Sequence, residues 1–480
     1  LSDPSGEQKL FFGAGEFVYK TSTDGVTDSL FPFDAESPLY NSQCAGDVDG
    51  DGDSEIVVLP QRAPLFILST DGTVENQIDF QGHTKSTPAL ADLDHDGKLE
   101  IVFGTLNGFL YALHADGTPL SDSFPINLGS GAFVLGGIAI GDINNDGNRE
   151  IVVPTLTKGI FAFDAQGILL PGWPFLPEGA VKAAPTIGKL KNNETMIIVG
   201  TDDGYLYILN GNGSAEKVVD IGHPIESSPI LSDVDGDGSL EILVNSADGY
   251  IFILNAEGEN WSDDVPFYVG GSIKSDPCVA DFNNDGYAEI VAATSDGKVH
   301  LLDIHGEEIA PFPLQTLHPS QSSPSIFDLD DDGNFEILLG NSAGLYVLDV
   351  KSVAGEGNFW SMYGATPART HNYDDINVSV TERTPKIERW VVSGATPNPS
   401  QKEVRIFYSL PVDATVKLDI FNVAGRRVKT LLNDKKLAKG KHYARWDLTD
   451  VNGKPVSDGV YFFRFKSKNY IHTGKILILR

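Results

Sequence analysis

Acidic side chains recur in this chain at a spacing that suits a divalent cation. Asp or Asn occupies positions one, three and five of a nine-residue stretch, Gly occupies position six and Glu position nine. Oxygen ligands at alternate positions around a glycine turn are typical of a calcium loop. Three or four carboxylates within nine residues repel one another unless a cation offsets their charge. The stretches are Asp47 to Glu55, Asp92 to Glu100, Asp142 to Glu150, Asp233 to Glu241, Asp281 to Glu289 and Asp328 to Glu336.

The sequence therefore predicts about six calcium ions, one in each acidic loop. Side chains at position seven vary so widely that only the main-chain carbonyl can serve there. Glu lies at position nine and a strand follows, whereas an EF-hand has Glu at position twelve and continues as a helix, so an EF-hand is excluded. The expected ligands are Asp47, Asp49, Asp51, Asp53, Glu55, Asp92, Asp94, Asp96, Lys98, Glu100, Asp142, Asn144, Asp146, Asn148, Glu150, Asp233, Asp235, Asp237, Ser239, Glu241, Asp281, Asn283, Asp285, Tyr287, Glu289, Asp328, Asp330, Asp332, Asn334 and Glu336.

The acidic loops belong to units that repeat along the chain. Their first residues, together with a degenerate copy that begins at Gly188, are 45 to 50 positions apart. The copy at Gly188 has lost the carboxylates, so we expect it to bind no calcium. A period in the forties with several short strands in each unit is typical of propeller blades.

Each unit predicts a meander of four short strands. Residues 241–245 and 250–254 are apolar runs separated by Ala-Asp-Gly, and a hairpin is expected there because primed turns need positive φ. The N-terminal residues fit the second to fourth strands of such a unit without its acidic loop. We expect an all-β chain with an eight-bladed β-propeller over residues 1–373. Seven blades are the alternative, if the N-terminal strands only complete a closing blade.

The acidic loops and the turns that follow them resemble the FG-GAP repeats of the integrin α-subunit propeller and of many bacterial secreted proteins. The Ser246-Ala-Asp-Gly249 turn is one such example. In that family the loop binds calcium between the first and second strands of a blade. The resemblance implies adhesion or ligand binding, although such repeats also occur beside catalytic domains and in some polysaccharide lyases.

The end of the chain predicts a second, smaller all-β domain. Apolar runs over 404–410, 416–421, 423–428, 440–446, 459–464 and 475–480 alternate with turn residues. This pattern predicts an Ig-like antiparallel β-sandwich of about seven strands over residues 387–480. Residues 374–386 are polar without apolar periodicity, and we expect them to form a linker.

The same C-terminal region resembles the sorting domain of type IX secretion substrates. The resemblance rests on Pro397-Asn398-Pro399, on the run Gly459-Val-Tyr-Phe and on the final basic residue, Arg480. It implies the type IX secretion machinery as a partner, followed by release or attachment at the outer cell surface.

The charge of the chain argues against nucleic acid as a partner, and its hydropathy argues against a membrane-spanning segment. The formal net charge is −32, and residues 1–386 have 59 acidic and 17 basic residues, most of the excess lying in the loops. Nucleic acid is not expected as a partner because its phosphates would be repelled. No apolar run approaches the roughly 18 residues of a membrane span.

A candidate ligand site lies just before the first strands of the units. Corresponding positions there contain Lys85, Lys182, Glu226, Lys274 and Gln321. First strands line the channel of a propeller, so these side chains would surround one channel mouth, opposite the calcium loops. Three lysines on an otherwise acidic domain could bind an anionic sugar, a carboxylate or an acidic segment of a partner. The simpler alternative is that they only balance the charge at a solvated channel mouth.

Motifs of nucleophilic, zinc-protease and phosphate-binding sites do not occur in the sequence. We therefore favour a secreted or surface-displayed binding or adhesion protein, stabilised by calcium, with an extracellular protein or glycan as its ligand. A polysaccharide lyase is one alternative. Another follows from Leu1, which begins almost inside a repeat: the chain would be the non-catalytic propeller part of a larger processed secreted enzyme, such as a protease.

Overall fold

The computed structural model divides the chain into two compact units. Unit 1 comprises Leu1–Ala280, Ala288–Lys351 and Gly357–Val378, and unit 2 comprises Asp281–Tyr287, Ser352–Glu356 and Ser379–Arg480. The described residues are 9–22, 26–28, 31–62, 64–191, 194–320, 322–330, 332–341, 344–351, 355, 359–362, 364–366, 369–377, 391–396, 400, 402, 404–410, 412–423, 425–438, 440–468 and 470–479. Among them, no helix is both long and apolar enough to cross a membrane.

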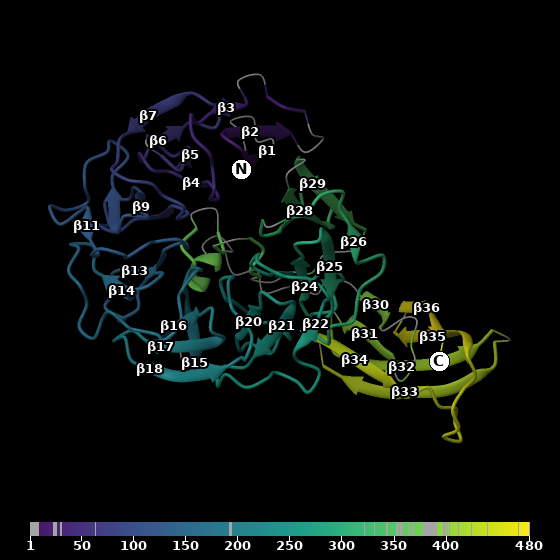
Figure 1. Cartoon of the computed structure of the whole chain (residues 1–480). Coiled ribbons are helices and arrows are strands. Elements are labelled where there is room, and N and C mark those ends of the chain that lie inside the picture. The colour runs from purple at the N-terminus through teal and green to yellow at the C-terminus, as the bar shows by residue number, and fades with distance from the viewer. Residues whose placement is uncertain are drawn as a thin grey trace. The chain divides into compact units, whose positions relative to one another are not determined.

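Unit 1 is built from small antiparallel sheets that follow one another along the chain (Figure 1). The first four are β1 (Lys9–Ala14), β2 (Phe17–Ser22) and β3 (Phe33–Asp34); β4 (Cys44–Gly46), β5 (Glu55–Val58), β6 (Leu65–Leu68) and β7 (Val74–Ile78); β8 (Ala89–Ala91), β9 (Glu100–Gly104), β10 (Phe109–Leu113) and β11 (Ile126–Asn127); and β12 (Ala139–Gly141), β13 (Glu150–Thr155) and β14 (Gly159–Phe163).

The next four are β15 (Thr186–Lys191), β16 (Glu194–Gly200), β17 (Tyr205–Asn210) and β18 (Ala215–Asp220); β19 (Ile230–Ser232), β20 (Glu241–Asn245), β21 (Tyr250–Leu254) and β22 (Phe267–Tyr268); β23 (Cys278–Ala280), β24 (Glu289–Ala293), β25 (Lys298–Leu302) and β26 (Leu314–Gln315); and β27 (Ser325–Phe327), β28 (Phe335–Asn341) and β29 (Gly344–Val350). Within the described residues, unit 1 therefore has eight sheets in sequence order.

The second and third strands form the core because both of their faces are apolar. Every residue of β9 and of β20 is buried, and each strand contains an Ile and a Val, which suit a strand buried on both faces. Short turns join them. Gly249 has φ +100°, and a Cβ there would lie 2.3 Å from the backbone oxygen of Gly271, so only glycine fits this turn.

The first strands of consecutive sheets converge, since β4 contacts β8, β8 contacts β12, and β12 contacts β15. The last segment of unit 1 returns to these strands. Ile140, Ile187, Val279 and Ile326 donate their backbone N–H groups to the carbonyls of Thr370, His371, Trp360 and Ser361 respectively, at 2.8–3.0 Å. In Figure 1 this green segment, with the short helix η1 (Tyr373–Asn377), lies among the sheets of unit 1. It satisfies edge groups that would otherwise lack partners.

Unit 2 contains the strands β30 (Val391–Thr396), β31 (Val404–Leu410), β32 (Ala414–Asn422), β33 (Arg427–Leu437), β34 (Gly440–Trp446), β35 (Gly459–Ser467) and β36 (Tyr470–Ile478). They form one sheet of order β30-β31-β34 and another of order β33-β32-β35-β36. Trp446 of β34 is fully buried in the core of this unit. Phe463 and Phe465 are buried beside it because alternate residues of β35 point inward.

One predicted strand in this unit is wrong. Residues 423–428 are predicted to be extended, but Val423, Gly425 and Arg426 lie in the connection between β32 and β33. Gly425 donates its N–H to the carbonyl of Asn422 at 2.9 Å and has φ +72°. The glycine and its neighbours favour a reversal of the chain over a continued strand.

Candidate metal centre

The acidic loops connect the first and second strands of their sheets. In an antiparallel meander, this connection and the turn between strands three and four lie at the same end of the strands. The turn between strands two and three and the passage to the next sheet lie at the opposite end. The acidic loops and the Lys-containing passages therefore occupy opposite ends of the unit 1 sheets.

Five of the six acidic loops are closed by their final glutamate. Glu241 at position nine accepts a hydrogen bond through Oε2 from the backbone N–H of Val234 at position two, at 3.0 Å. The same bond recurs between Glu55 and Val48 (2.9 Å), Glu100 and Leu93 (2.7 Å), Glu150 and Ile143 (3.0 Å) and Glu336 and Leu329 (2.7 Å). Oε2 of these five glutamates is thus fixed. Oε1 of Glu150 accepts a further hydrogen bond from the Asn144 side chain at 3.0 Å.

The first aspartate organises the turn. Its Oδ2 accepts the N–H of the glycine at position six, at 2.9–3.2 Å, in all six loops. Position four also adopts positive φ: 82° at Gly50, 63° at His95, 59° at Asn145 and 55° at Asn284. Gly and Asn adopt positive φ more readily than other residues, so their presence at position four is a further sign of the loop in the sequence. The prediction used positions one, three, five, six and nine and did not include it.

Position seven presents its backbone to the loop. The N–H of residue seven donates to Oδ1 of residue five at 2.9 Å for Asp53 and for Lys98, and at 2.7 Å for Ser239. This arrangement does not depend on the side chain, which explains why the residue type varies.

The donor set fits a hard divalent cation. Ligand oxygens of three aspartates lie within 4.8 Å of one another in the loops of Asp92–Asp94–Asp96, Asp233–Asp235–Asp237 and Asp328–Asp330–Asp332, and Asp47, Asp49 and Glu55 form a similar group. Oδ1 of Asp92 and of Asp328, and Oε1 of Glu100 and of Glu336, are buried without a hydrogen-bond partner. Buried carboxylate oxygens without a partner are costly, and a bound cation would satisfy them.

Without a bound ion, the surroundings of these glutamates disfavour their charged form. Burial, followed by repulsion from neighbouring aspartates, raises the pKa of Glu55, Glu100 and Glu150 to about 7 and that of Glu241 to about 8. A nearby positive charge would reverse this tendency.

The degenerate copy has become a hairpin. β15 has six residues, whereas β19 has three, and its pairing with β16 extends to Lys191 and Glu194. Residues 192 and 193 lie outside the described part of the chain. Lys189 forms an ion pair with Asp374 at 3.3 Å. Strand pairing and a lysine thus occupy the place of the acidic loop.

The structure brings three of the candidate ligand residues together. Lys182 Nζ lies 2.9 Å from Glu226 and 3.1 Å from Asp202, and Lys274 Nζ lies 3.2 Å from Glu226. Hydrogen bonding to Glu226 raises the pKa of Lys182, and the reciprocal bond lowers that of Glu226. These charges balance within the group.

Lys85 stands apart from that ion-pair group. Its Nζ lies 5.1 Å from the centre of the Tyr40 ring, a cation–π contact. Gln321 lies outside the described residues.

Aromatic side chains at the same end of the sheets were missed. The His223 and Tyr250 rings are 4.3 Å apart, Tyr250 and Tyr268 are 4.9 Å apart, and Tyr268 is 63% exposed. His223 Nδ1 also lies 2.7 Å from a carboxylate oxygen of Asp248. We call these four residues the aromatic patch. Its signal in the sequence was Tyr268, an aromatic residue at an outward position of a strand.

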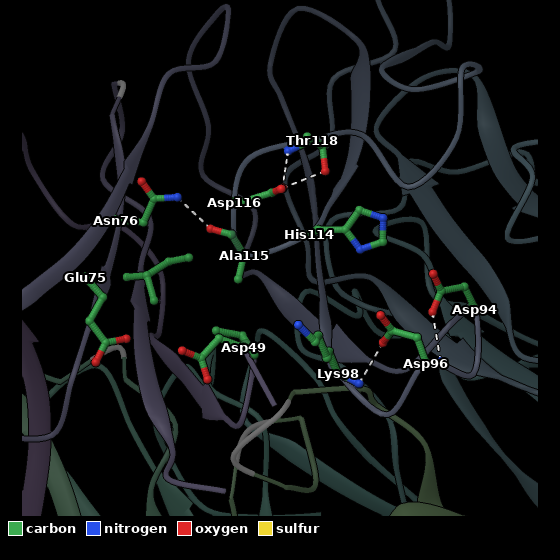
Figure 2. Close-up of a pocket in the computed structure, with 12 residues that line it drawn as sticks. Asp49, Glu75, Asn76, Asp94, Asp96, Lys98, His114, Ala115, Asp116 and Thr118 are labelled. Carbon is green, nitrogen blue, oxygen red and sulfur yellow. Dashed lines mark hydrogen bonds between the residues drawn. The ribbon is translucent and has the colours of Figure 1, made fainter. Parts of the chain in front are cut away.

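A pocket of about 600 Å³ opens beside the second acidic loop. It is lined by residues of two neighbouring sheets, including Asp49, Glu75, Asp94, Lys98 and His114. Figure 2 shows carboxylates on both sides of this pocket, with Lys98 between them. His114 was not predicted as a ligand because it lies outside the nine-residue pattern.

Two family models match the sequence. The FG-GAP-like repeat matches residues 47–103, 92–153, 233–292 and 281–339, stretches that include all six acidic loops. The secretion system C-terminal sorting domain matches residues 396–479. No curated protein matches the sequence significantly.

Solved structures are similar in fold. The yeast protein Sqt1 from Saccharomyces cerevisiae has a TM-score of 0.53 at 13% identity, over 71% of this chain and 91% of its own. The V. cholerae biofilm matrix protein Bap1 has a TM-score of 0.52 at 14% identity, over 73% of this chain and 84% of its own. At such identities the likeness concerns the fold alone.

The observations agree on an all-β, propeller-like chain whose acidic clusters could bind metal ions. Its C-terminal region engages the type IX secretion machinery, which delivers proteins to the cell surface or the extracellular space. The chain contains FG-GAP-like repeats over residues 47–153 and 233–339 and a secretion-system C-terminal sorting domain over residues 396–479.

Proposed function

We propose that this protein is an extracellular binding or adhesion protein whose propeller is held rigid by calcium. The observation that carries the proposal is the recurring loop in which a buried glutamate is tied to position two while aspartate oxygens converge beside it. Rigidity matters because a preorganised surface loses less entropy when it binds a ligand.

We infer that the eight sheets of unit 1 are eight blades. The first sheet supplies strands that correspond to the second, third and fourth of a blade, and the last sheet supplies the first three, so each forms its own blade. Residues 387–480 are proposed to form an Ig-like sandwich. Residues 374–386 remain the proposed linker, although Tyr373–Asn377 form η1 and Asp375 is paired with Arg149 at 2.8 Å in unit 1.

The calcium ions are assigned to the six acidic loops. Positions one, three and five would supply side-chain oxygens, position seven its carbonyl and position nine the remaining oxygen of the glutamate. Each bound ion would neutralise the crowded carboxylates and fix the connection between two core strands. The ions therefore serve structure, and the ligand is bound elsewhere.

We place the ligand at the opposite end of the sheets. Tyr268 is 63% exposed, Tyr40 59% and Leu317 85%, and all three lie near the passages between sheets. Exposed aromatic side chains provide rigid contact area at small entropic cost and stack well on other flat or apolar groups. Since Lys182 and Lys274 are already paired, the aromatic patch is the stronger anchor and the lysines the charged surroundings.

A binding screen tests this function. The secreted chain in calcium would be applied to arrays of glycans and extracellular proteins, and every positive would be repeated with Tyr268→Ala and with the triple variant Lys85→Ala, Lys182→Ala and Lys274→Ala. We expect Tyr268→Ala to weaken binding more than tenfold. Val74→Ala, at an exposed strand position of another sheet, is the matched control. Binding that survives both site variants unchanged would refute the assigned face.

A further inference from the structure

His114 occupies a turn position that three of its counterparts use differently. It follows β10 and begins the turn to Thr118, with the N–H of His114 donating to the Thr118 carbonyl at 2.9 Å. In the sheets β12–β14, β19–β22 and β23–β26 the corresponding residues are Asp164, Asn255 and Asp303. Their side chains accept N–H groups of their own turns, at 2.8 Å from Ile168, 2.9 Å from Glu259 and 2.9 Å from Glu307.

In the His114 turn, as in the turns that begin at Ser69 and Asn210, the residue two positions further on accepts the N–H instead. Asp116 Oδ1 accepts the N–H of Thr118 at 2.8 Å, which satisfies the turn two residues further on. The imidazole of His114 is therefore not needed for the turn and lies instead beside the acidic loop. Its Nδ1 is 3.3 Å from Oε1 of Glu100.

A three-donor cluster results. Atoms of Asp94, Glu100 and His114 lie within 4.8 Å of one another. Glu100 is fully buried, and its Oε1, the atom that faces His114, has no hydrogen-bond partner. A buried carboxylate oxygen directed at two further donors is the arrangement that a metal ion completes.

Donor chemistry separates this cluster from the other loops. Calcium prefers oxygen and gains little from an imidazole, whereas zinc and its neighbours in the transition series bind imidazole well. Carboxylate oxygen and imidazole nitrogen are both zinc ligands, and a zinc site with three protein ligands keeps its fourth position for water or a substrate.

We propose that Asp94, Glu100 and His114 form a transition-metal site, with zinc as the preferred ion, and that it competes with calcium at the second loop. Asp94 and Glu100 are shared with the calcium loop of the proposed function, while His114 is specific to the new site. The pocket beside His114 leaves room for water or a ligand group as a further donor (Figure 2).

The experiment measures zinc and cobalt binding to the calcium-loaded full-length chain by calorimetry and by the visible spectrum of cobalt. The wild type is expected to bind one zinc equivalent tightly, with a cobalt spectrum that shows nitrogen ligation. His114→Ala should lose that equivalent and that spectrum. His223→Ala removes a histidine that pairs with a single carboxylate, and it should retain both.

The proposed calcium sites are monitored separately in the same variants. His114→Ala should keep the wild-type calcium stoichiometry and its melting temperature in calcium, which also shows that the variant folds. Zinc binding by His114→Ala with wild-type affinity, or loss of the equivalent in His223→Ala, would overturn the proposal. If calcium does not stabilise the wild type, the proposed function is contradicted instead. The zinc measurement then still decides whether Asp94, Glu100 and His114 bind a transition metal.

Discussion

The carboxylate of Glu241 accepts the backbone N–H of Val234 at 3.0 Å, so the last residue of an acidic loop is tied to its second. This bond shapes the loop before any ion arrives. It leaves one glutamate oxygen and three aspartate side chains on the same side of the turn, where Asp233, Asp235 and Asp237 approach one another. The loop is thus preorganised for a cation and strained by charge without one.

Replacing Glu241 by Gln tests a single loop. Gln keeps the oxygen that Val234 requires but loses the charge, so we expect one calcium equivalent to disappear. At calcium a hundredfold above Kd, one site contributes about 2.7 kcal/mol to the free energy of unfolding. Calcium calorimetry and thermal melts measure both effects.

Glu194→Gln is the matched control, because Glu194 follows the connection in the degenerate copy. Its calcium stoichiometry should equal that of the wild type. Equal stoichiometry in both variants would show that position nine holds no ion.

Trp360→Ala probes the returning segment of unit 1. Trp360 is fully buried, and its carbonyl accepts the N–H of Val279 at 3.0 Å. Removing a buried Trp side chain costs about 3–5 kcal/mol, so unfolding should occur at clearly lower denaturant concentration. Leu317→Ala, at a residue 85% exposed, should change stability by less than about 0.5 kcal/mol. A Trp360→Ala chain as stable as the control would show that the segment is not part of the core.

Asp276 gives a pH dependence of stability. Burial raises the pKa of this carboxyl to about 7 from 3.8, despite the hydrogen bond from Ser228 and the Arg369 charge, which lower it. The folded state therefore keeps a proton that the unfolded state releases near pH 4. The stabilising contribution is complete below that pH and is lost as pH rises through 7.

Asp276→Asn should remove the contribution of this carboxyl to the dependence of the free energy of unfolding on pH. In saturating calcium, we expect the free energy of unfolding of the wild type to fall relative to that of the variant between pH 5 and 8, by on the order of a few kcal/mol. Asp122→Asn, at an exposed residue, should keep the wild-type slope. Parallel pH profiles for the wild type and Asp276→Asn would contradict the assignment.

Removal of residues 396–480 tests the sorting domain in cells. The truncated chain should remain inside the cell, because it lacks the segment that engages the secretion machinery. Tyr268→Ala, which leaves this domain intact, should still be exported. The measurement compares both variants in the medium, at the surface and in cell lysates, and truncated chain outside the cell would count against the prediction.

Much of the architecture could be read from the sequence because its signals are local. The acidic loops, the Asp-Gly turns and the apolar runs each lie within about ten residues, and their repetition identifies the units. The strand over Val404–Leu410 was predicted with the bounds that the structure gives.

What escaped prediction depends on contacts between distant residues. The bonds from Ile140 and Ile187 to Thr370 and His371 are made by backbone groups, which leave no mark on residue type. His114 meets Glu100 only because two turns lie at the same end of one sheet. The pairing of Lys182 with Glu226 likewise joins residues from separate repeats.

The most direct test of the central claim is a thermal melt of the full-length chain with calcium, with excess chelator, and with calcium restored. Six loops that each contribute up to about 2.7 kcal/mol would together equal the stability of a typical domain, about 5–15 kcal/mol. We predict that chelation lowers the melting temperature by many degrees and that calcium returns it, with a stoichiometry near six. A melting temperature that does not change on chelation would contradict the account.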